Sequence, residues 1–370
     1  MLDGTAVATA AERIAREARL VGFPLAGSTP LGALDRRPFL ERWLAEGRAG
    51  EMGYLARRTA ERMDPRMAFP WACSIVSLAY PYRPPPAPAG DWQAELRGRI
   101  AAYALGVDYH DRVGALLERL IARLQDVFPA ARFRPYVDTG PVLEREWAAR
   151  AGLGWIGKNT LVLHRSAGSY FFLAELLTDL SLDAVPLPAD HCGTCTRCLT
   201  ACPTGALEAY AMDPRRCISY LTIEHRSAIP RELRPHLANW IFGCDLCQQA
   251  CPWNAGASGT GAAEALMPRL PPLLELDAAS FRARFGRTAV ARAKRRGLLR
   301  NVAVVLGNSE NPEAVPPLAA ALLDPEPLVR GHAAWALGRL GGAAARHSLE
   351  AARARETDPG AAAEIEAALA

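Results

Sequence analysis

The sequence has no long apolar run and little excess of charge of either sign. No uncharged apolar stretch reaches the roughly 18 residues that a membrane-spanning helix requires. The first residues, Met1–Thr5, contain neither the basic start nor the apolar segment of a secretory signal. The formal net charge is only +4 over 370 residues. These absences predict a cytoplasmic protein without membrane contact, and the length predicts two or three domains.

Cysteine, by contrast, is concentrated in one segment. The first run has the pattern C-x2-C-x2-C-x3-C-P, the bacterial ferredoxin spacing for 4Fe–4S clusters, and consists of Cys192, Cys195, Cys198 and Cys202. A second set ends in C-x2-C-x3-C-P and consists of Cys217, Cys244, Cys247 and Cys251. In two-cluster ferredoxins the fourth cysteine of each run ligates the other cluster. The spacing therefore predicts one cluster on Cys192, Cys195, Cys198 and Cys251, and a second on Cys202, Cys217, Cys244 and Cys247.

Three other interpretations of these cysteines compete with clusters. Disulfides need an oxidising compartment. Zinc sites use C-x2-C pairs, whereas a third C-x2 step followed by C-x3-C-P is foreign to zinc ribbons. Inert buried cysteines rarely keep such spacing. Two 4Fe–4S clusters are therefore the favoured interpretation, and the ninth cysteine, Cys73, is expected in the core because an apolar run follows it.

Strands and helices alternate in the first half of the chain, which predicts an α/β or α+β core with one main sheet. Helices are expected at residues 6–20, 38–46 and 108–128 and from Pro141 onward, and strands at 74–80, 100–105, 133–137, 160–164 and 168–177. Within the cysteine segment, residues 233–241 are expected to be helical. The predicted domains are residues 1–180, a ferredoxin-like domain at 181–260, and a helical region at 261–370.

A glycine-rich stretch, Gly152–Gly157, matches the dinucleotide-binding pattern G-x-G-x-x-G and nearly matches a P-loop. Both motifs require a strand before the glycines and a helix after them. Here a helix is expected before them and a strand after them, so nucleotide binding is disfavoured. Close approach of the backbone to a flat ligand is the preferred explanation of these glycines.

The stretch from Phe281 to Arg300 contains no acidic residue. Its basic residues are Arg282, Arg284, Arg287, Arg292, Lys294, Arg295, Arg296 and Arg300. A solvated helix face usually mixes signs, so the patch favours binding to a polyanion, most simply nucleic acid. The chain then becomes helical and repetitive, and residues 329–338 resemble the second helix of a HEAT-type repeat.

The order of several motifs resembles the epoxyqueuosine reductase family over about residues 6–350. They are Tyr136-Val137-Asp138-Thr139-Gly140, Gly168-Ser169-Tyr170, the segment from Cys192 to Gly205, Arg216-Cys217-Ile218-Ser219-Tyr220-Leu221-Thr222, Gly243-Cys244-Asp245-Leu246-Cys247-Gln248 and the HEAT-like tail. This resemblance implies an α+β fold with a nitroreductase-like cobalamin-binding core, and a relationship to reductive dehalogenases. It also implies reduction of epoxyqueuosine to queuosine at the wobble base of tRNA, the last step of queuosine synthesis, by an enzyme that uses cobalamin and two 4Fe–4S clusters.

The resemblance also implies roles for single residues. Asp138 is the proton donor, because the opening epoxide oxygen needs a proton; from the residues alone, a turn or a helix cap explains it equally well. Matching positions place the following residues near the cobalamin: Arg62, Ala101, Asp138, Asn159, Thr160, Leu161, Val162, Leu173, Ser219, Cys244 and Asp245. The D-x-H-x-x-G signature of another cobalamin class is absent, because Asp108-Tyr109-His110 is followed by Gly114 one position late.

Two alternatives belong to other classes. A dehalogenase-type reductase of a small molecule predicts an export signal and no nucleic-acid surface. An electron-transfer ferredoxin leaves the first 180 residues without a role and predicts no bound corrinoid. The expected partners are tRNA carrying epoxyqueuosine and an external electron donor of low potential, and the chain is expected to be a monomer.

Overall fold

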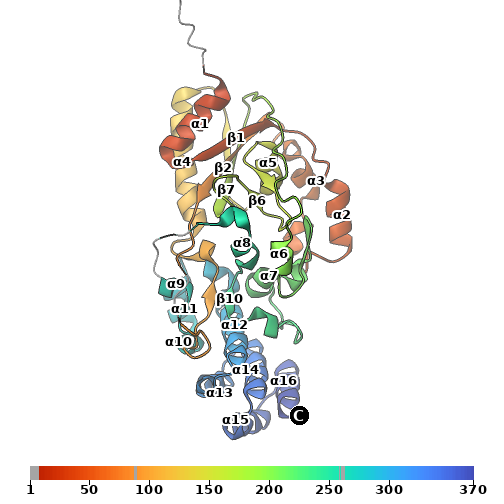
Figure 1. Cartoon of the computed structure of the whole chain (residues 1–370), viewed down its shortest axis with the longest axis vertical. Coiled ribbons are helices and arrows are strands. Elements are labelled where there is room, and N and C mark those ends of the chain that lie inside the picture. The colour runs from red at the N-terminus through yellow and green to blue at the C-terminus, as the bar shows by residue number, and fades with distance from the viewer. Residues whose placement is uncertain (1–7, 87–89, 258, 260–262) are drawn as a thin grey trace, which may run out of the picture.

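A computed structural model describes residues 8–86, 90–257, 259 and 263–370. The predicted start of the first helix at residue 6 and the predicted boundary between residues 260 and 261 lie outside these residues. Figure 1 shows three parts along the long axis of the molecule: a sheet with its helices, a middle part with short elements, and a stack of helices that ends at the C-terminus.

The first part is a four-stranded antiparallel sheet with strand order β1-β2-β7-β4. Its strands are β1 (Leu25–Pro30), β2 (Ser74–Pro81), β4 (Phe133–Tyr136) and β7 (Phe171–Thr178). The helices of this part are α1 (Ala10–Val21), α2 (Arg37–Ala45), α3 (Thr59–Met63), α4 (Tyr109–Val127) and α5 (Glu144–Arg150). Most of the expected elements are confirmed, but Pro141 lies before α5 rather than in its first turn.

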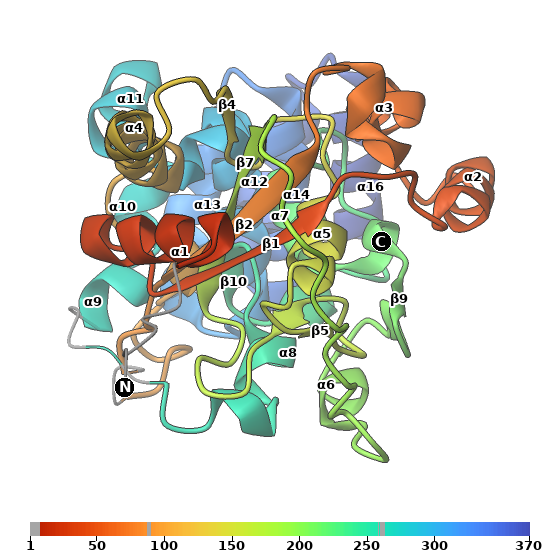
Figure 2. The same cartoon turned by 90° about the horizontal axis from the view of Figure 1, so that it is seen from above.

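Alternation along the strands assigns the two faces of the sheet. Val76 and Leu78 of β2 point to one face and pack with buried residues of α1 and α4. Ile75 of β2 and Leu177 of β7 point to the other face and pack with Trp147 of α5. Figure 2 shows α1 and α4 on one side of the strands and α5 on the other. Because successive side chains alternate between faces, one sheet serves two apolar layers.

The middle part is built from short elements around the cysteines. They are β5 (Trp155–Ile156), β6 (Val162–Leu163), α6 (Arg197–Thr200), β8 (Leu207–Glu208), β9 (Ala211–Met212), α7 (Ile218–Ile223), β10 (Trp240–Phe242) and α8 (Leu246–Gln249). Helix α5 precedes the glycine stretch and strand β6 follows it, which is the order expected from the sequence. At Gly154 a β-carbon would meet the Leu163 carbonyl oxygen at 2.1 Å. The close approach is therefore between the two strands of this hairpin.

Two expected elements are wrong. Residues 233–241 contain only a short 3-10 helix at Pro235–Leu237 and then strand β10. The strand expected at 100–105 is confined to β3 (Arg99–Ile100), followed by a 3-10 helix at Ala102–Ala104. β3 pairs in parallel with β10, so this segment of the first half of the chain is joined to the second half by backbone hydrogen bonds.

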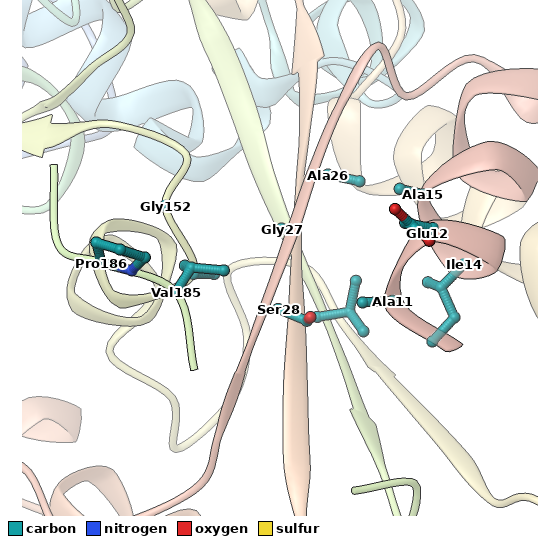
Figure 3. Close-up of a pocket in the computed structure, with 12 residues that line it drawn as sticks. Ala11, Glu12, Ile14, Ala15, Ala26, Gly27, Ser28, Gly152, Val185 and Pro186 are labelled. Carbon is teal, nitrogen blue, oxygen red and sulfur yellow. The ribbon is translucent and has the colours of Figure 1, made fainter. Parts of the chain in front are cut away.

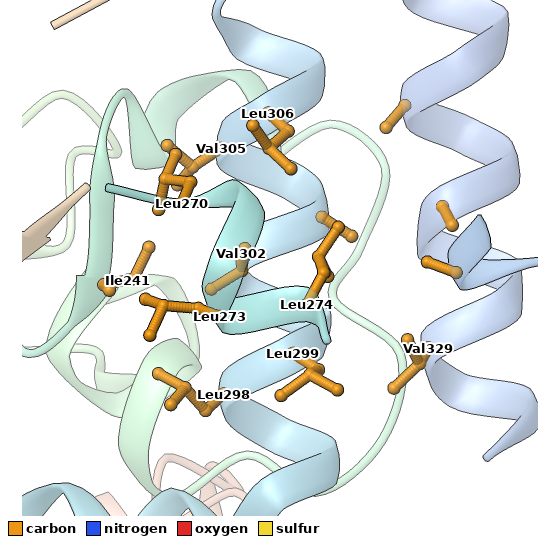
Figure 4. Packing of buried hydrophobic residues seen from close by; sticks show 14 of the residues in the cluster. Ile241, Leu270, Leu273, Leu274, Leu298, Leu299, Val302, Val305, Leu306 and Val329 are labelled. Atoms are coloured by element: carbon orange, nitrogen blue, oxygen red, sulfur yellow. The ribbon is translucent and has the colours of Figure 1, made fainter. Parts of the chain in front are cut away.

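The last part consists of α9 (Ala263–Leu266), α10 (Pro271–Leu274), α11 (Ala278–Phe285), α12 (Lys294–Asn308), α13 (Val315–Ala321), α14 (Pro327–Leu340), α15 (Ala343–Arg353) and α16 (Pro359–Leu369). Its core centres on α12, which is buried on nearly all sides (Figure 4). Leu96 and Ile100 join the same core from the first half of the chain. Among the described residues, no helix combines the length and apolar composition needed to cross a membrane.

Candidate functional site

Asp138 lies on the loop that follows β4, and its side chain is 54% exposed. The phenol of Tyr109, at the start of α4, donates a hydrogen bond of 2.6 Å to Asp138 Oδ2. The Nε2 atom of His110 lies 3.7 Å from the same oxygen. Burial, with the negative charge of Asp138, raises the pKa of Tyr109, so the phenol stays a donor. The carboxyl of Asp138 is thus held by one neighbour while half of it faces solvent.

A network behind Tyr109 reaches the basic stretch. Arg292 lies over the Tyr109 ring at 5.0 Å and donates to Asp108 Oδ1 at 3.0 Å. The same Asp108 oxygen lies 3.1 Å from His110 Nδ1. Burial acts to raise the pKa of Asp108, but hydrogen bonds from His110 and Arg292 outweigh it and lower the pKa. Asp108 is therefore a carboxylate that orients both His110 and Arg292.

The Asp138 loop is also held from the other side. Arg62 of α3 donates to the Gly140 carbonyl oxygen at 3.3 Å and to the Tyr54 carbonyl oxygen at 3.4 Å. The Asp138 backbone N–H donates to Glu144 Oε1 at 2.6 Å. Arg62, predicted beside a cofactor, and Asp138 are thus brought together, and Glu144 joins them.

The interactions among the cysteines divide them into two adjoining groups, since Cys247 of the second group is influenced by Cys217 and Cys202 but also by Cys198 of the first. The pKa of the Cys251 thiol is raised by burial and then by the neighbouring Cys192 and Cys195 thiolates, and Cys198 has Cys251 and Cys192 as its neighbours. In the second group, Cys217 is influenced by Cys202, and Cys244 by Cys217 and Cys247. None of the nine cysteines is in a disulfide. Cys251 therefore lies with the first run although it is distant from it in sequence.

No three ligand-type side chains among the described residues surround a point as ligands of a single metal ion would. A cubane cluster differs from such an ion, because it takes one thiolate at each of four separate iron corners. The two groups of thiols suit that chemistry, since soft thiolates are the ligands of iron–sulfur clusters.

Contacts also join the first cysteine run to the glycine stretch. Lys158 Nζ donates to the carbonyl oxygens of Gly193 at 2.6 Å and Cys195 at 3.0 Å. The rings of Trp155 and Trp253 pack edge to face at 5.1 Å. The first run is thus fixed against the hairpin that contains Asn159 to Val162.

The remaining residues predicted to lie near a cobalamin are found in two places. Ala101, Cys244 and Asp245 lie together, because Asp245 Oδ2 accepts the Ala102 N–H at 2.7 Å and Cys244 packs against the apolar cluster that contains Ala101. Ser219 lies in helix α7, which packs on β10. Val162 and Leu173 share one apolar cluster, beside Asn159, Thr160 and Leu161 of the hairpin. Burial raises the pKa of Asp245 to about 6.

Two aromatic rings contact Tyr109, the hydrogen-bond partner of Asp138. Tyr103 contacts Tyr109 at 6.1 Å between ring centres, and Phe172 stacks on Tyr109 at 4.6 Å. The pKa of Tyr103 is raised by burial and further by Asp138 and Asp245. Tyr103 also packs against the apolar cluster that contains Ala101, so this ring links Tyr109 to one of the two places.

Two cavities of about 370 Å³ each lie outside this centre. The first lies between α1, β1 and the segment around Val185, and contains none of the predicted residues (Figure 3). The second is lined by Arg99, Tyr170 and Asp245, together with Pro84, Pro85 and Pro86. The second cavity therefore touches one predicted site residue.

Only some of the side chains of the basic stretch are exposed at the protein surface. Arg282, Arg284, Arg287 and Lys294 are exposed, whereas Arg292, Arg295 and Arg296 are half-buried. Arg295 is paired with Asp324. Arg300 is completely buried and donates to the carbonyl oxygens of His225 and Ser227. The prediction that Arg300 contacts a nucleic acid is therefore wrong, because its guanidinium joins α12 to the segment after α7.

The prediction for Cys73 is also wrong. Its side chain is exposed, because Cys73 precedes β2, and the burial of that strand begins at Ser74.

Three family models match this chain. One described as a 4Fe-4S double cluster binding domain covers residues 191–254, one described as Epoxyqueuosine reductase QueG covers 62–139, and one described as HEAT repeats covers 288–370. An epoxyqueuosine reductase of Pseudomonas aeruginosa is 43% identical over 87% of this chain and 92% of its own length. The chain belongs to the epoxyqueuosine reductase family. The Escherichia coli reductase agrees, with 40% identity over 89% of each chain.

Solved structures of epoxyqueuosine reductases have the same fold. One, in complex with an epoxyqueuosine-modified tRNA stem loop, has a TM-score of 0.87 and 32% identity, and the match covers 97% of each chain. Another, from Bacillus subtilis, has its aspartate-bearing catalytic loop swung out of the active site, and matches with a TM-score of 0.87 and 31% identity over 97% of each chain.

Several residues of the site were not found by reasoning from the sequence. Tyr109 and His110 have no sequence signal beyond an incomplete cobalamin motif, and the run of like charges groups Arg292 with residues that would bind nucleic acid. Glu175 carried a readable signal, because it is the one charged residue of strand β7. A charged side chain is almost never fully buried in an apolar strand unless it interacts with a polar or charged partner.

Proposed function

We propose that this chain reduces epoxyqueuosine in tRNA to queuosine, with cobalamin and two 4Fe–4S clusters as cofactors and Asp138 as the proton donor. The observation that carries the proposal is the hydrogen bond of 2.6 Å between Tyr109 and Asp138, on a loop that Arg62 also contacts. Membership of the family and the solved tRNA stem-loop complex of a relative support tRNA as the substrate. Such an enzyme would work in the cytoplasm and take electrons from an external donor.

The reaction converts an epoxide into an alkene and water, and it consumes two electrons and two protons. Asp138, in its protonated form, would give a proton to the epoxide oxygen as the C–O bond breaks, so that no free alkoxide forms. Tyr109 would then stabilise the resulting carboxylate, since a hydrogen bond to a charged acceptor is stronger than one to a neutral acceptor. His110, 3.7 Å from Asp138 Oδ2, is near enough to move into contact and return a proton.

In the proposed arrangement, each cluster is bound by three cysteines of one set and by the last cysteine of the other set. One takes Cys192, Cys195, Cys198 and Cys251, and the other takes Cys202, Cys217, Cys244 and Cys247. The neighbours of Cys251 and Cys217 in space support this assignment. When bound, each cluster passes one electron at a time, so two clusters suit a two-electron reduction.

The residues present also fit a cobalamin. Asn159 is 4% exposed, and among the described residues its Nδ2 has no acceptor, so a ligand carbonyl from a corrin amide would satisfy it. Leu161 and Leu173 are half-buried and would supply apolar contact. When bound, cobalamin supplies the reduced cobalt that acts on the epoxide carbon. The hypothesis that Ala101, Thr160, Val162, Ser219, Cys244 and Asp245 line the site stays part of this proposal.

The exposed basic residues are proposed to bind the tRNA backbone. These are Arg282, Arg284, Arg287 and Lys294, with the half-buried Arg296 at their edge. Phosphate contacts of this kind position a nucleic acid without reading its sequence. In the proposed division of labour, residues 1–180 bind cobalamin, 181–260 hold the clusters and 261–370 bind tRNA.

The test is a comparison of wild type with Asp138→Asn, both loaded with clusters and cobalamin. Each is incubated with a reductant and tRNA that carries epoxyqueuosine, and nucleoside mass spectrometry reports the loss of one oxygen. The amide can still accept from Tyr109, but it cannot give the proton, so turnover should fall by about 10²- to 10⁴-fold. Iron content and the corrinoid spectrum should stay as in wild type. Near-wild-type turnover would remove Asp138 from the mechanism.

A further inference from the structure

Glu175 occupies an unusual place for an acid. It lies in the middle of β7, where its cross-strand neighbours are Ser77 of β2 and Tyr136 of β4. Its side chain is completely buried. The alternation of the strand points it to the face on which α5 packs, between Leu177 and Leu173, which belong to two apolar clusters. A carboxylate at this place would be cut off from water, which makes its negative charge costly.

Because α5 packs on β7, the alternation of the strand brings Glu175 against this helix, whose first residue is Glu144, and the two carboxyls act on each other. Among the described residues, neither oxygen of Glu175 meets a donor N–H or O–H. Two carboxyl groups can hydrogen-bond to each other only if a proton lies between them. Burial, followed by the charge of Asp138, raises the pKa of Glu144 to about 7. Burial and then the charge of Glu144 raise the pKa of Glu175 still more.

The backbone of Asp138 needs support from its surroundings. Its φ of 58° lies in the left-handed region, which residues other than glycine adopt at a cost. The Asp138 N–H donates to Glu144 Oε1 at 2.6 Å. A series of interactions therefore connects the buried Glu175, through Glu144, to the backbone of the proposed proton donor. None of these contacts involves the reacting carboxyl itself.

We propose that Glu144 and Glu175 share one proton and together position Asp138 for catalysis, so that Asp138 loses its position when that proton is removed. Both are positioning residues, because they act through the Asp138 backbone. The inference rests on the proposed function in one respect only, namely that Asp138 is the group that must be positioned.

The charges around the pair set the direction of its pH dependence. The groups that face it are the Asp138 carboxyl from the loop, Arg145 from α5, and Ser77 and Tyr136 from the two neighbouring strands. Arg145 is the one cation in this set, and it also donates to the Thr160 carbonyl oxygen at 2.6 Å. Removal of the shared proton leaves one negative charge on the buried Glu175 and one on the half-buried Glu144, close to a third on Asp138. The ionised Glu144 accepts the Asp138 N–H more strongly, but repulsion from the Asp138 carboxylate is the larger of the two effects. Raising the pH above neutrality should therefore release the loop.

The experiment measures hydrogen exchange at the Asp138 amide in the cluster- and cobalamin-loaded protein, together with single-turnover rates at saturating tRNA. Glu144→Ala removes the acceptor, so it should speed amide exchange and lower turnover by about 10- to 100-fold. Glu144→Gln is the conservative control, because its amide oxygen can still accept the Asp138 N–H. It should restore most of the protection and turnover that the alanine variant loses.

Glu175→Gln gives the sharper result. The glutamine amide imitates a permanently protonated Glu175, because it donates to Glu144 at any pH. Wild type should lose protection at Asp138 as the pH rises above about 7, whereas Glu175→Gln should keep it. Turnover of both proteins should fall with rising pH, because Asp138 itself must be protonated to act, so the kinetic readout is the ratio of the two rates, which should shift in favour of Glu175→Gln. Comparison at equal pH removes the intrinsic pH dependence of exchange.

Identical pH profiles for wild type and Glu175→Gln, or unchanged exchange in Glu144→Ala, would overturn the positioning role. Altered exchange as expected, combined with an active Asp138→Asn variant, would leave the positioning intact and refute the proton-donor assignment instead. If Glu144→Ala fails to fold, the near-isosteric Glu144→Gln and Glu175→Gln still decide the question.

Discussion

Replacing Arg292 by methionine separates two roles that one basic stretch could have. Arg292 is half-buried, pairs with Asp108 at 3.0 Å and covers the Tyr109 ring at 5.0 Å. Methionine keeps much of the apolar volume of the side chain but removes its charge and its donors. The expected effect is a misplaced Tyr109, and hence a misplaced Asp138, rather than weaker tRNA binding.

The size of this effect follows from the contacts. A hydrogen bond to a charged group contributes about 1.5–3 kcal/mol, and a cation over an aromatic ring adds about 0.5–1 kcal/mol at a partly exposed site. If only the hydrogen bond contributes to stabilising the transition state, its loss lowers turnover by about 10- to 150-fold. Single-turnover rates at saturating tRNA measure the loss without a contribution from tRNA affinity.

Arg287→Met is the matched comparison, because Arg287 belongs to the same stretch but is exposed. It should weaken tRNA binding and reduce the slope of log K against log salt by up to about 0.9, the value for one phosphate contact. Arg292→Met should leave that slope close to wild type. The reasoning is refuted if Arg292→Met changes the salt slope as Arg287→Met does while its rate at saturating tRNA stays normal.

Further predictions concern the clusters and the helical part. Cys247→Ser should lose about half of the iron, since one of two four-iron clusters loses a thiolate, whereas the exposed Cys73→Ser should keep all of it; iron analysis and the visible spectrum report both. Arg300→Met should lower the free energy of unfolding by at least about 3 kcal/mol, because several buried carbonyl oxygens lose their donor, while Arg296→Met in the same helix should cost much less. Urea denaturation followed by far-UV circular dichroism compares the two, and equal midpoints would contradict the assigned role of Arg300.

The features that sequence reasoning found are those with a short-range signal. Cysteine spacing reports local ligand chemistry, and the amphipathic period of residues 108–128 closely predicted α4. The failures depend on distant partners. Residues 233–241 were expected to be helical, but Trp240–Phe242 pairs with β3 about 140 residues earlier, which a local pattern does not contain. Tertiary pairing overrides local propensity in such cases.

The same limit applies to the site. Asp138 was found through its motif, yet its partner Tyr109 lies 29 residues earlier and showed only an incomplete signature of another class. Arg300 was grouped with its basic neighbours, because a sequence of like charges does not reveal which of them points inward. Buried arginines such as this one are tolerated when backbone carbonyls satisfy their donors.

The pairing of β3 with β10 has a consequence for how the chain is made. Arg99 and Ile100 leave the ribosome well before Trp240–Phe242, their partners in the parallel pair, and long before α12 and α14, with which Leu96 and Ile100 share a core. Contacts between residues so far apart in sequence close large loops and form slowly. During synthesis, this apolar segment therefore stays unpaired until the later residues have been made, and in that time it can aggregate or be bound by a chaperone. A protein cut between the sheet and the helical repeats should accordingly give fragments that do not fold separately.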